Sequence, residues 1–200
     1  MERDDLALLR RVADGDEGAL RDLFARYRAP LNRYLWRQLR DGRAVEEALQ
    51  DVFVAVWRDA GSFRGAAKVI TWLFQIAHYR VLRARRNELR HASDEPLAED
   101  ERDTNQSGQA DWLSASPEDM VIDRLALASA LEHLSAKHRE VLELVFIFGF
   151  SADEVARILD TPVGTVKSRV SYARRALASA LAAQRSDTAQ PAKPVKEGQE

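Results

Sequence analysis

Apolar residues recur along most of the chain at steps of three and four, the spacing that places them on one face of an α-helix. The first ninety residues hold four such stripes, within residues 20–27, 30–39, 45–56 and 70–90. Pro30 suits the first turn of a helix, so we expect a new helix to begin there. The glycines of residues 61–65 interrupt the pattern and predict a loop. Residues 1–90 are therefore expected to form a first, helical domain.

The pattern changes after residue 90. Residues 91–116 show no period and are rich in Asp, Glu, Ser, Asn and Gln, which predicts a mobile linker. Helical spacing resumes over residues 117–185, with Ser116 as the N-cap. The polar tail, residues 186–200, is expected to be disordered. The expected fold class is all-α, with two small helical domains joined by an acidic flexible linker.

The second domain ends in the pattern of a helix-turn-helix. One helix is expected over Ser135–Gly149, with the serine as its N-cap and the glycine as its end. Ser151 and Glu154 have the spacing of a capping box, which predicts the start of a short helix. After Thr161-Pro162, a last helix is expected to reach about Ala183.

Composition and charge narrow the class of protein. The absence of cysteine excludes disulfides, thiolate zinc sites and cysteine nucleophiles. No apolar run approaches the roughly 18 residues of a membrane span, and the charged residues 1–5 do not begin a secretory signal. We therefore expect a cytoplasmic protein without membrane insertion. The net charge of −2 hides a partition, because residues 1–90 carry +5 and residues 91–117 carry −6.

The last predicted helix has the charge of a DNA-binding surface. No acidic residue lies between Val163 and Arg185, whereas residues 118–162 hold nine, and acids repel DNA phosphates. The second helix of a helix-turn-helix enters the major groove. Base edges would meet its polar side at Lys167, Ser168, Ser171 and Tyr172, and phosphates would meet Arg169 and Arg174. The alternative is a basic, solvated helix in a plain helical hairpin.

Residues 68–90 combine basic and aromatic side chains. This segment contains six basic residues and one acidic residue, Glu88, and Trp72, Phe74 and Tyr79 lie among them. Aromatic rings stack on unpaired bases while cations hold phosphates, so this segment is predicted to bind single-stranded nucleic acid. The alternative for Trp72 is a place in the core.

The other signals are weaker. Residues 44–58 predict an amphipathic helix whose acidic outer face, by itself, indicates only a solvated surface. His133 and His138 are five residues apart and do not share a helix face, so they are poor joint metal ligands. The sequence has no Walker loop, dinucleotide glycine pattern or nucleophile elbow. We expect no catalytic residue, metal, cofactor or small-molecule substrate, and therefore no enzyme.

Three blocks of the sequence carry a family resemblance. They are AVEEALQDVFVAVWR at Ala44–Arg58, TWLFQIAHYRVLRARR at Thr71–Arg86, and SADEVARILDTPVGTVKSRVSYARRAL at Ser151–Leu177. In this order and spacing they resemble bacterial RNA polymerase sigma factors of the extracytoplasmic-function (ECF) class, in the sigma-70 family. With the helices around them, they cover about residues 6–90 and 117–183.

The resemblance implies a role for each block. Residues 1–90 would be a region 2-like domain and residues 117–185 a region 4-like domain. Core RNA polymerase would bind the first block through Glu46, Glu47, Gln50, Asp51, Phe53 and Trp57. The −10 promoter DNA, with one base flipped out of the stack, would contact Phe63, Arg64, Lys68, Trp72, Tyr79, Arg80, Arg83, Arg85 and Arg86. The −35 DNA would contact Thr165, Lys167, Ser168, Arg169, Ser171, Tyr172 and Arg174.

The resemblance also implies an anti-sigma factor as a partner and leaves other questions open. The linker would either thread the polymerase channel, its carboxylates in place of RNA phosphates, or serve as a tether. Where the family commonly has an Asn followed four residues later by an Asp, this chain has Tyr79 and Arg83, so no −10 preference is implied. The alternative function is a helix-turn-helix regulator that binds an operator without polymerase, which would explain residues 118–183 only.

Overall fold

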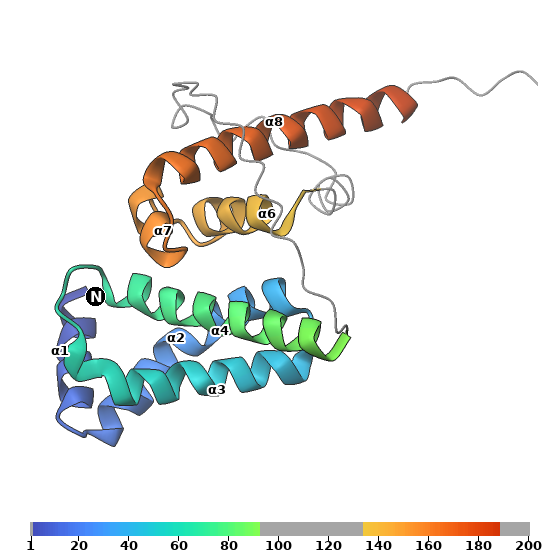
Figure 1. The fold of residues 1–200 in the computed structure, drawn as a ribbon. Helices are drawn as coiled ribbons and strands as arrows, with labels where there is room; N and C mark the ends of the chain where they lie inside the picture. The colour runs from blue at the N-terminus through green and yellow to red at the C-terminus, as the bar shows by residue number, and fades with distance from the viewer. Residues whose placement is uncertain (1, 93–133, 189–200) are drawn as a thin grey trace, which may run out of the picture. The chain divides into compact units, whose positions relative to one another are not determined.

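The computed structural model describes residues 2–92 and 134–188, and every regular element in these two ranges is helical (Figure 1). The predicted all-α fold is thereby confirmed for this part of the chain. In chain order the elements are α1 (Glu2–Ala13), α2 (Glu17–Leu39), α3 (Gly42–Asp59), η1 (Ala60–Ser62), α4 (Val69–Ala92), α6 (Ala136–Leu142), η3 (Glu143–Ile147), α7 (Ala152–Ile158) and α8 (Val163–Thr188). The predicted linker, the helix expected after Ser116 and the tail beyond residue 188 lie outside the described residues.

The described helices fall into two compact units. The first contains α1 to α4, η1 and residues 144–166. The second contains α6 and the part of α8 that begins at Lys167.

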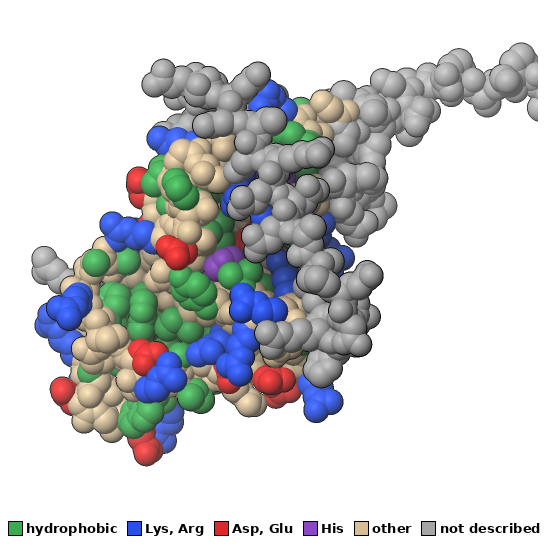
Figure 2. Space-filling view, viewed as in Figure 1, with side chains coloured by type: hydrophobic (Ala, Val, Ile, Leu, Met, Phe, Trp, Pro, Cys, Tyr) green, Lys and Arg blue, Asp and Glu red, His purple; other side chains and the backbone are tan. Residues whose placement is uncertain are grey.

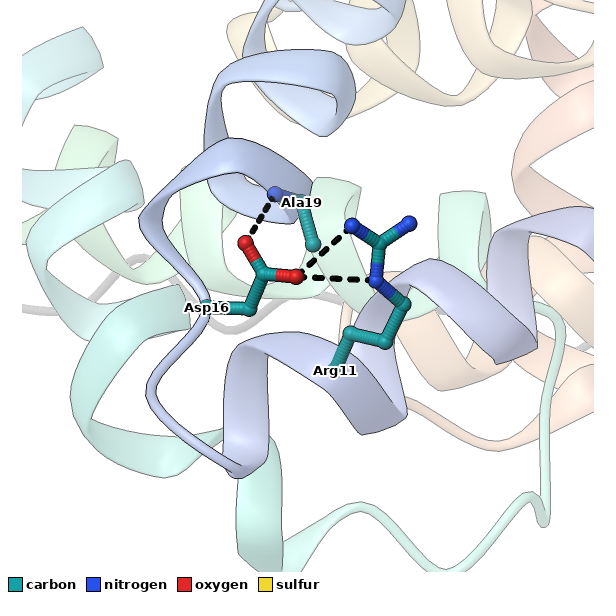
Figure 3. Close-up of polar contacts among 3 residues, drawn as sticks. All are labelled: Arg11, Asp16 and Ala19. Carbon is teal, nitrogen blue, oxygen red and sulfur yellow. Dashed lines mark hydrogen bonds and ion pairs between the residues drawn. The ribbon is translucent and has the colours of Figure 1, made fainter.

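Aspartates open the second and third helices of the first unit. The Asp16 carboxylate accepts the Ala19 N–H at 3.1 Å, and the Asp41 carboxylate accepts the Ala44 N–H at 2.7 Å. Arg11 on α1 also donates to Asp16, from Nε at 2.9 Å and from Nη2 at 2.7 Å (Figure 3). The Ala19 N–H and the Arg11 guanidinium hold the pKa of Asp16 below its ordinary value. Asp16 therefore both caps α2 and connects this helix to α1.

The predicted helix start at Pro30 is wrong, because α2 runs unbroken from Glu17 to Leu39 with Pro30 inside it. Proline removes one backbone hydrogen bond and crowds the preceding turn. Burial on both sides of the proline opposes that cost, since Leu23 and Tyr27 precede it and Leu31 follows it on the buried face. Packing against other helices therefore outweighs the preference of proline for the first turn of a helix.

The core of the first unit lies where α2, α3 and α4 pack together. Leu31, Val52 and Leu73 are fully buried there, one from each helix, and each such side chain contributes about 1.5–3 kcal/mol. The Tyr34 ring lies 5.3 Å from that of Phe74. The Tyr34 hydroxyl lies 3.3 Å from Nδ1 of His78, so these buried polar atoms are paired. One face of α4 is fixed in this core, which leaves its opposite face for other contacts.

Residues 144–166 complete the first unit. Phe148 and Phe150 place their rings 5.1 and 4.8 Å from that of Phe74. Gly149 ends the preceding helical segment with φ +74°, a conformation that favours glycine. Ser151 and Glu154 form the predicted capping box, with bonds of 3.3 and 2.9 Å between side chain and backbone N–H. Both sequence predictions are confirmed.

Within the described residues, the second unit contains α6 and the part of α8 from Lys167 onward. Ser135 caps α6 as predicted, its hydroxyl accepting the His138 N–H at 3.5 Å. The last helix, α8, continues to Thr188 instead of ending near Ala183. No glycine or proline occurs between Gly164 and Pro191, so the chain has no local helix breaker before that point.

Candidate nucleic-acid and protein interfaces

The two sides of α3 differ as the sequence predicts. Its apolar stripe is buried, from Val45 to Val56. Glu46, Glu47 and Gln50 are exposed on the opposite side. α3 therefore presents two carboxylates and an amide to solvent from a helix that the core holds rigidly.

Aromatic side chains extend this acidic face. Trp57 is 40% exposed, whereas Phe53 is only 7% exposed. The Phe24 ring of α2 meets the Phe53 ring edge-on at 4.8 Å and is itself exposed, as is Val54. Phe53 thus supports the surface from within, and Phe24 and Val54 form part of it. The sequence analysis did not assign Phe24 or Val54 to this surface. Phe24 follows the apolar period of α2 and was therefore expected in the core. Val54 could have been found, because it is an apolar residue on the polar side of α3.

Asp51 joins two sets of residues that the sequence analysis kept separate. Its carboxylate lies 3.9 Å from Nη1 of Arg80 and 3.9 Å from Nη1 of Arg83. The structure therefore brings a predicted polymerase-binding residue beside two predicted DNA-binding residues. The Arg83 side chain is exposed, whereas that of Arg80 is half-buried. Because an exposed pair is worth about 1 kcal/mol or less, Arg83 can exchange Asp51 for another anion at little cost.

The loop before α4 carries a pair of aromatic rings. The Phe63 ring lies 5.2 Å from the Trp72 ring at an angle of 49°. Both side chains are half-buried, and Arg64 beside them is exposed. Gly65 has φ +72°, and no atom would lie within 4 Å of an added Cβ, so its backbone conformation alone favours glycine. Trp72 is therefore neither wholly core nor wholly surface.

The outer face of α4 is basic and aromatic. Tyr79 is 47% exposed, and Arg83 and Arg86 are exposed with it. Arg85 differs, because its Nη2 donates to both the backbone oxygen and the side-chain oxygen of Gln38, each at 3.0 Å. Arg85 thus ties α4 to the end of α2. On the face drawn in Figure 2, Lys and Arg side chains of the first unit are interspersed with Asp and Glu.

Two of the predicted −10 residues contact residues 144–166 of their own unit. Lys68 Nζ lies 3.0 Å from the Glu154 carboxylate, and the Tyr79 hydroxyl donates to Asp160 at 3.2 Å. Desolvation by burial is the main cause that raises the pKa of Tyr79, and the bond to Asp160 adds to it. A nucleic acid bound to this face of α4 would have to replace both contacts.

The turn between α7 and α8 is closed by backbone bonds. Thr161 N–H donates to Ala156 at 3.0 Å, Val166 N–H donates to Pro162 at 3.1 Å, and Asp160 adopts φ +47°. These bonds give the tight turn that the helix-turn-helix prediction requires.

The faces of α8 follow the predicted register. Val166, Val170 and Ala173 are buried. Lys167 and Ser168 are exposed, as is Tyr172 at 53%. Of the residues predicted to contact −35 DNA, Thr165, Arg169, Ser171 and Arg174 are half-buried.

Tyr172 has a neighbour that sequence reasoning considered only as a metal ligand. The His138 ring of α6 lies 4.4 Å from the Tyr172 ring, with 31° between the planes. The Ser135 hydroxyl lies 2.7 Å from Nδ1 of His138. No periodicity in the sequence relates residues 138 and 172, so only the fold reveals this pair.

The described residues contain neither a candidate metal site nor a membrane-spanning helix. In residues 2–92 and 134–188, no three His, Cys, Asp or Glu side chains are grouped so that they could hold a metal ion. In the same ranges, no helix is long and apolar enough to cross a membrane.

Comparison with known proteins places the chain in a class. The family described as Sigma-70 region 2 matches residues 23–91, which include α3 and the basic face of α4. The family described as Sigma-70, region 4 matches residues 124–177, which include α7, the turn and the first part of α8. The interfaces described above thus lie in two regions of the sigma-70 family, in the order expected.

Full-length relatives define the class more narrowly. The chain is 33% identical over 181 residues to the ECF RNA polymerase sigma-E factor of Escherichia coli K12, covering 86% of this chain and 92% of the relative. It is 30% identical over 168 residues to the ECF RNA polymerase sigma factor SigL of Mycobacterium tuberculosis Erdman, covering 83% and 90%. The chain belongs to the ECF sigma factors of the sigma-70 family.

Solved structures agree with this membership. CnrH, solved in complex with the cytosolic domain of CnrY, matches with a TM-score of 0.61 and 25% identity, covering 90% of this chain and 97% of CnrH. The sigma factor RpoE from Bartonella quintana, solved with the anti-sigma factor NepR, matches with a TM-score of 0.59 and 26% identity, covering 81% and 96%.

Proposed function

We propose that this ECF sigma factor binds core RNA polymerase, directs it to promoters by reading −35 and −10 elements, and helps to separate the strands at the −10 element. The observation that carries the proposal is the presence of both sigma regions in one chain, each with an exposed face suited to its partner. As a transcription initiation factor it leaves bond formation to the polymerase. It acts in the cytoplasm, where polymerase and promoter DNA meet.

Polymerase binds the acidic face of α3 in this proposal. Glu46, Glu47 and Gln50 supply an exposed polar surface, and Trp57 and Phe24 supply apolar contact area beside it. Aromatic anchors within a charged rim are typical of protein interfaces whose energy is concentrated in a few residues. The partner surface should therefore be basic, with an apolar centre.

The −10 strand binds the basic face of α4 and the loop before it. Phe63 and Trp72 offer ring surfaces for an extruded base, whose unstacking costs a few kcal/mol. Tyr79 offers a stacking surface, and the exposed Arg83 can transfer from Asp51 to a phosphate, while the half-buried Arg80 adds positive charge beside it. The predicted −10 residue Arg85 acts here through its bonds to Gln38, by holding the helix in place.

The −35 duplex binds the exposed side of α8. Lys167 and Ser168 lie in the first turns of the recognition helix, the part that enters the major groove. Arg169 and Arg174, which are half-buried on the same helix, contact phosphates in this proposal.

An anti-sigma factor belongs among the partners. The matched sigma factor RpoE was solved in complex with the anti-sigma factor NepR, and the matched protein CnrH was solved in complex with the cytosolic domain of CnrY. A protein that occupies the α3 face or the α8 face would prevent polymerase or DNA from binding there.

The test is reconstitution with core polymerase. We expect the full chain to co-elute with core enzyme in a one-to-one ratio and to permit transcription from a subset of promoters in a genomic library. If the chain instead protects specific duplexes without polymerase and never co-elutes with it, the protein is an operator-binding regulator and the proposal is wrong.

A further inference from the structure

Tyr172 is held on the outer side of α8 by a side chain from another helix. Tyr172 is 53% exposed, yet its ring lies 4.4 Å from the His138 ring with 31° between the planes, a tilted arrangement nearer to stacked than to edge-on. Offset-stacked aromatic pairs are favourable at this separation. Because the outer side of α8 also carries Lys167 and Ser168, the stack lies on the surface that the proposed function assigns to −35 DNA.

His138 is itself fixed at a second point. The Ser135 hydroxyl lies 2.7 Å from Nδ1 of His138 and also accepts the His138 backbone N–H at 3.5 Å. The same serine caps α6. The imidazole is therefore held at its edge by the helix cap and lies with its face toward Tyr172.

An exposed tyrosine without a packed neighbour populates several side-chain rotamers, and binding then costs the entropy of selecting one. The stack removes part of that cost before DNA arrives. A tyrosine ring presented in one orientation can make a directed apolar contact, and the apolar group that the major groove offers is the C5-methyl group of thymine.

We propose that His138 is a positioning residue that holds the Tyr172 ring for contact with a thymine methyl group in the −35 element, and so sets the base preference at one base pair. This inference rests on the proposed function, because it requires α8 to read DNA. His138 itself need not touch the DNA.

The experiment uses polymerase holoenzyme assembled with the full chain and a duplex library randomised over the upstream element. Wild type is compared with His138→Ala, His138→Phe, Tyr172→Ala and the double alanine variant. His138→Ala and Tyr172→Ala should each reduce thymine preference at the same base pair, about twofold to tenfold. The double variant should lose no more than Tyr172→Ala alone, and His138→Phe, which keeps a ring, should retain the preference.

A second measurement isolates the methyl group. Replacing that thymine by uracil removes only the C5-methyl, and should weaken wild type and His138→Phe but leave His138→Ala and Tyr172→Ala unchanged. A uniform loss of affinity for all sequences in His138→Ala, or additive effects of the two alanine changes, would overturn the inference. Loss of the preference in His138→Phe would overturn it too. A wild-type holoenzyme without any upstream preference would instead refute −35 reading by α8, which is a failure of the proposed function.

Discussion

The basic faces of α4 and α8 differ in what holds their side chains. On α4, Arg80 and Arg83 lie 3.9 Å from Asp51, and Arg85 donates to Gln38 at 3.0 Å. On α8, the outward positions are exposed and Tyr172 is held by a ring stack. The arginines of the α4 face thus contact a carboxylate and an amide of their own unit, whereas the tyrosine of the α8 face contacts an aromatic ring.

This difference matches the two tasks proposed for the faces. Reading an intact duplex favours side chains that are ordered before the DNA binds, and the contact with His138 orders Tyr172 on α8. Opening a duplex requires cations that move onto phosphates as the strands part, and α4 keeps such a cation, the exposed Arg83, on a weak, replaceable partner. Asp51 lies on the helix proposed to bind polymerase, so the partner of these arginines belongs to the docking helix.

The largest effect is expected from charge reversals on α3, the helix proposed to bind polymerase. Glu47→Lys and Asp51→Lys together should weaken binding to core polymerase about a hundredfold, because each places a cation against a surface that accepts anions. Separately, they should differ. Glu47→Lys should affect polymerase binding alone, whereas Asp51→Lys should also impair promoter opening, since it repels Arg80 and Arg83.

Affinity for core polymerase and permanganate reactivity of the opened −10 region are the measurements. Asp14→Lys, an exposed charge reversal outside α3, is the matched control. Unchanged polymerase binding in both α3 variants, with helicity retained, would exclude this helix as the docking face.

Much of this arrangement follows from the sequence, and the exceptions have physical causes. Helix periods, the Ser151 cap and the outward register of α8 are local properties, so the pattern predicted them. The continuity of α2 through Pro30 depends on burial by other helices. The Asp51–arginine pairs and the His138–Tyr172 stack join residues far apart in the chain, and no spacing rule relates them.

The next effect tests the aromatic part of the α4 face. Tyr79→Ala should reduce transcription from an intact promoter about tenfold, within the range of a lost base–aromatic stack. A promoter opened in advance by mismatches should restore it, because the strand no longer has to be captured. Tyr79→Phe keeps the ring but loses the hydroxyl that bonds Asp160, and should behave like wild type. Failure of the mismatched promoter to rescue Tyr79→Ala would show that Tyr79 has a structural role only.

A smaller effect separates sequence reading from affinity on α8. Lys167→Ala should flatten the preference at one −35 position about fivefold, because a lysine donor favours guanine acceptors. Arg174→Ala should weaken all sequences alike and reduce the slope of log affinity against log salt by about one. Binding to duplex variants at several salt concentrations measures both. A changed promoter choice in Arg174→Ala, with none in Lys167→Ala, would mean that α8 sits rotated in the groove.

The smallest expected effect is on the thermal stability of the first unit at low pH. The comparison of the two faces requires that this unit stays folded while its carboxylates titrate. The pKa of Asp16 is lowered by the Ala19 N–H and by Arg11, so its folded pKa lies below the unfolded value of about 3.9. The stability this carboxylate contributes is therefore fully present above about pH 4 and is lost as the pH falls through the lowered pKa. Asp16→Asn keeps an N-cap acceptor but loses the charge that attracts Arg11. Its Tm should lie below that of wild type at pH 7, and the gap should close as the pH falls through that range. Glu17→Gln, the neighbouring exposed acid, controls for net charge. A gap of the same size at pH 7 and at pH 2 would mean that the Arg11–Asp16 pair contributes nothing to stability, and that the gap comes from the N-cap bond to Ala19 alone.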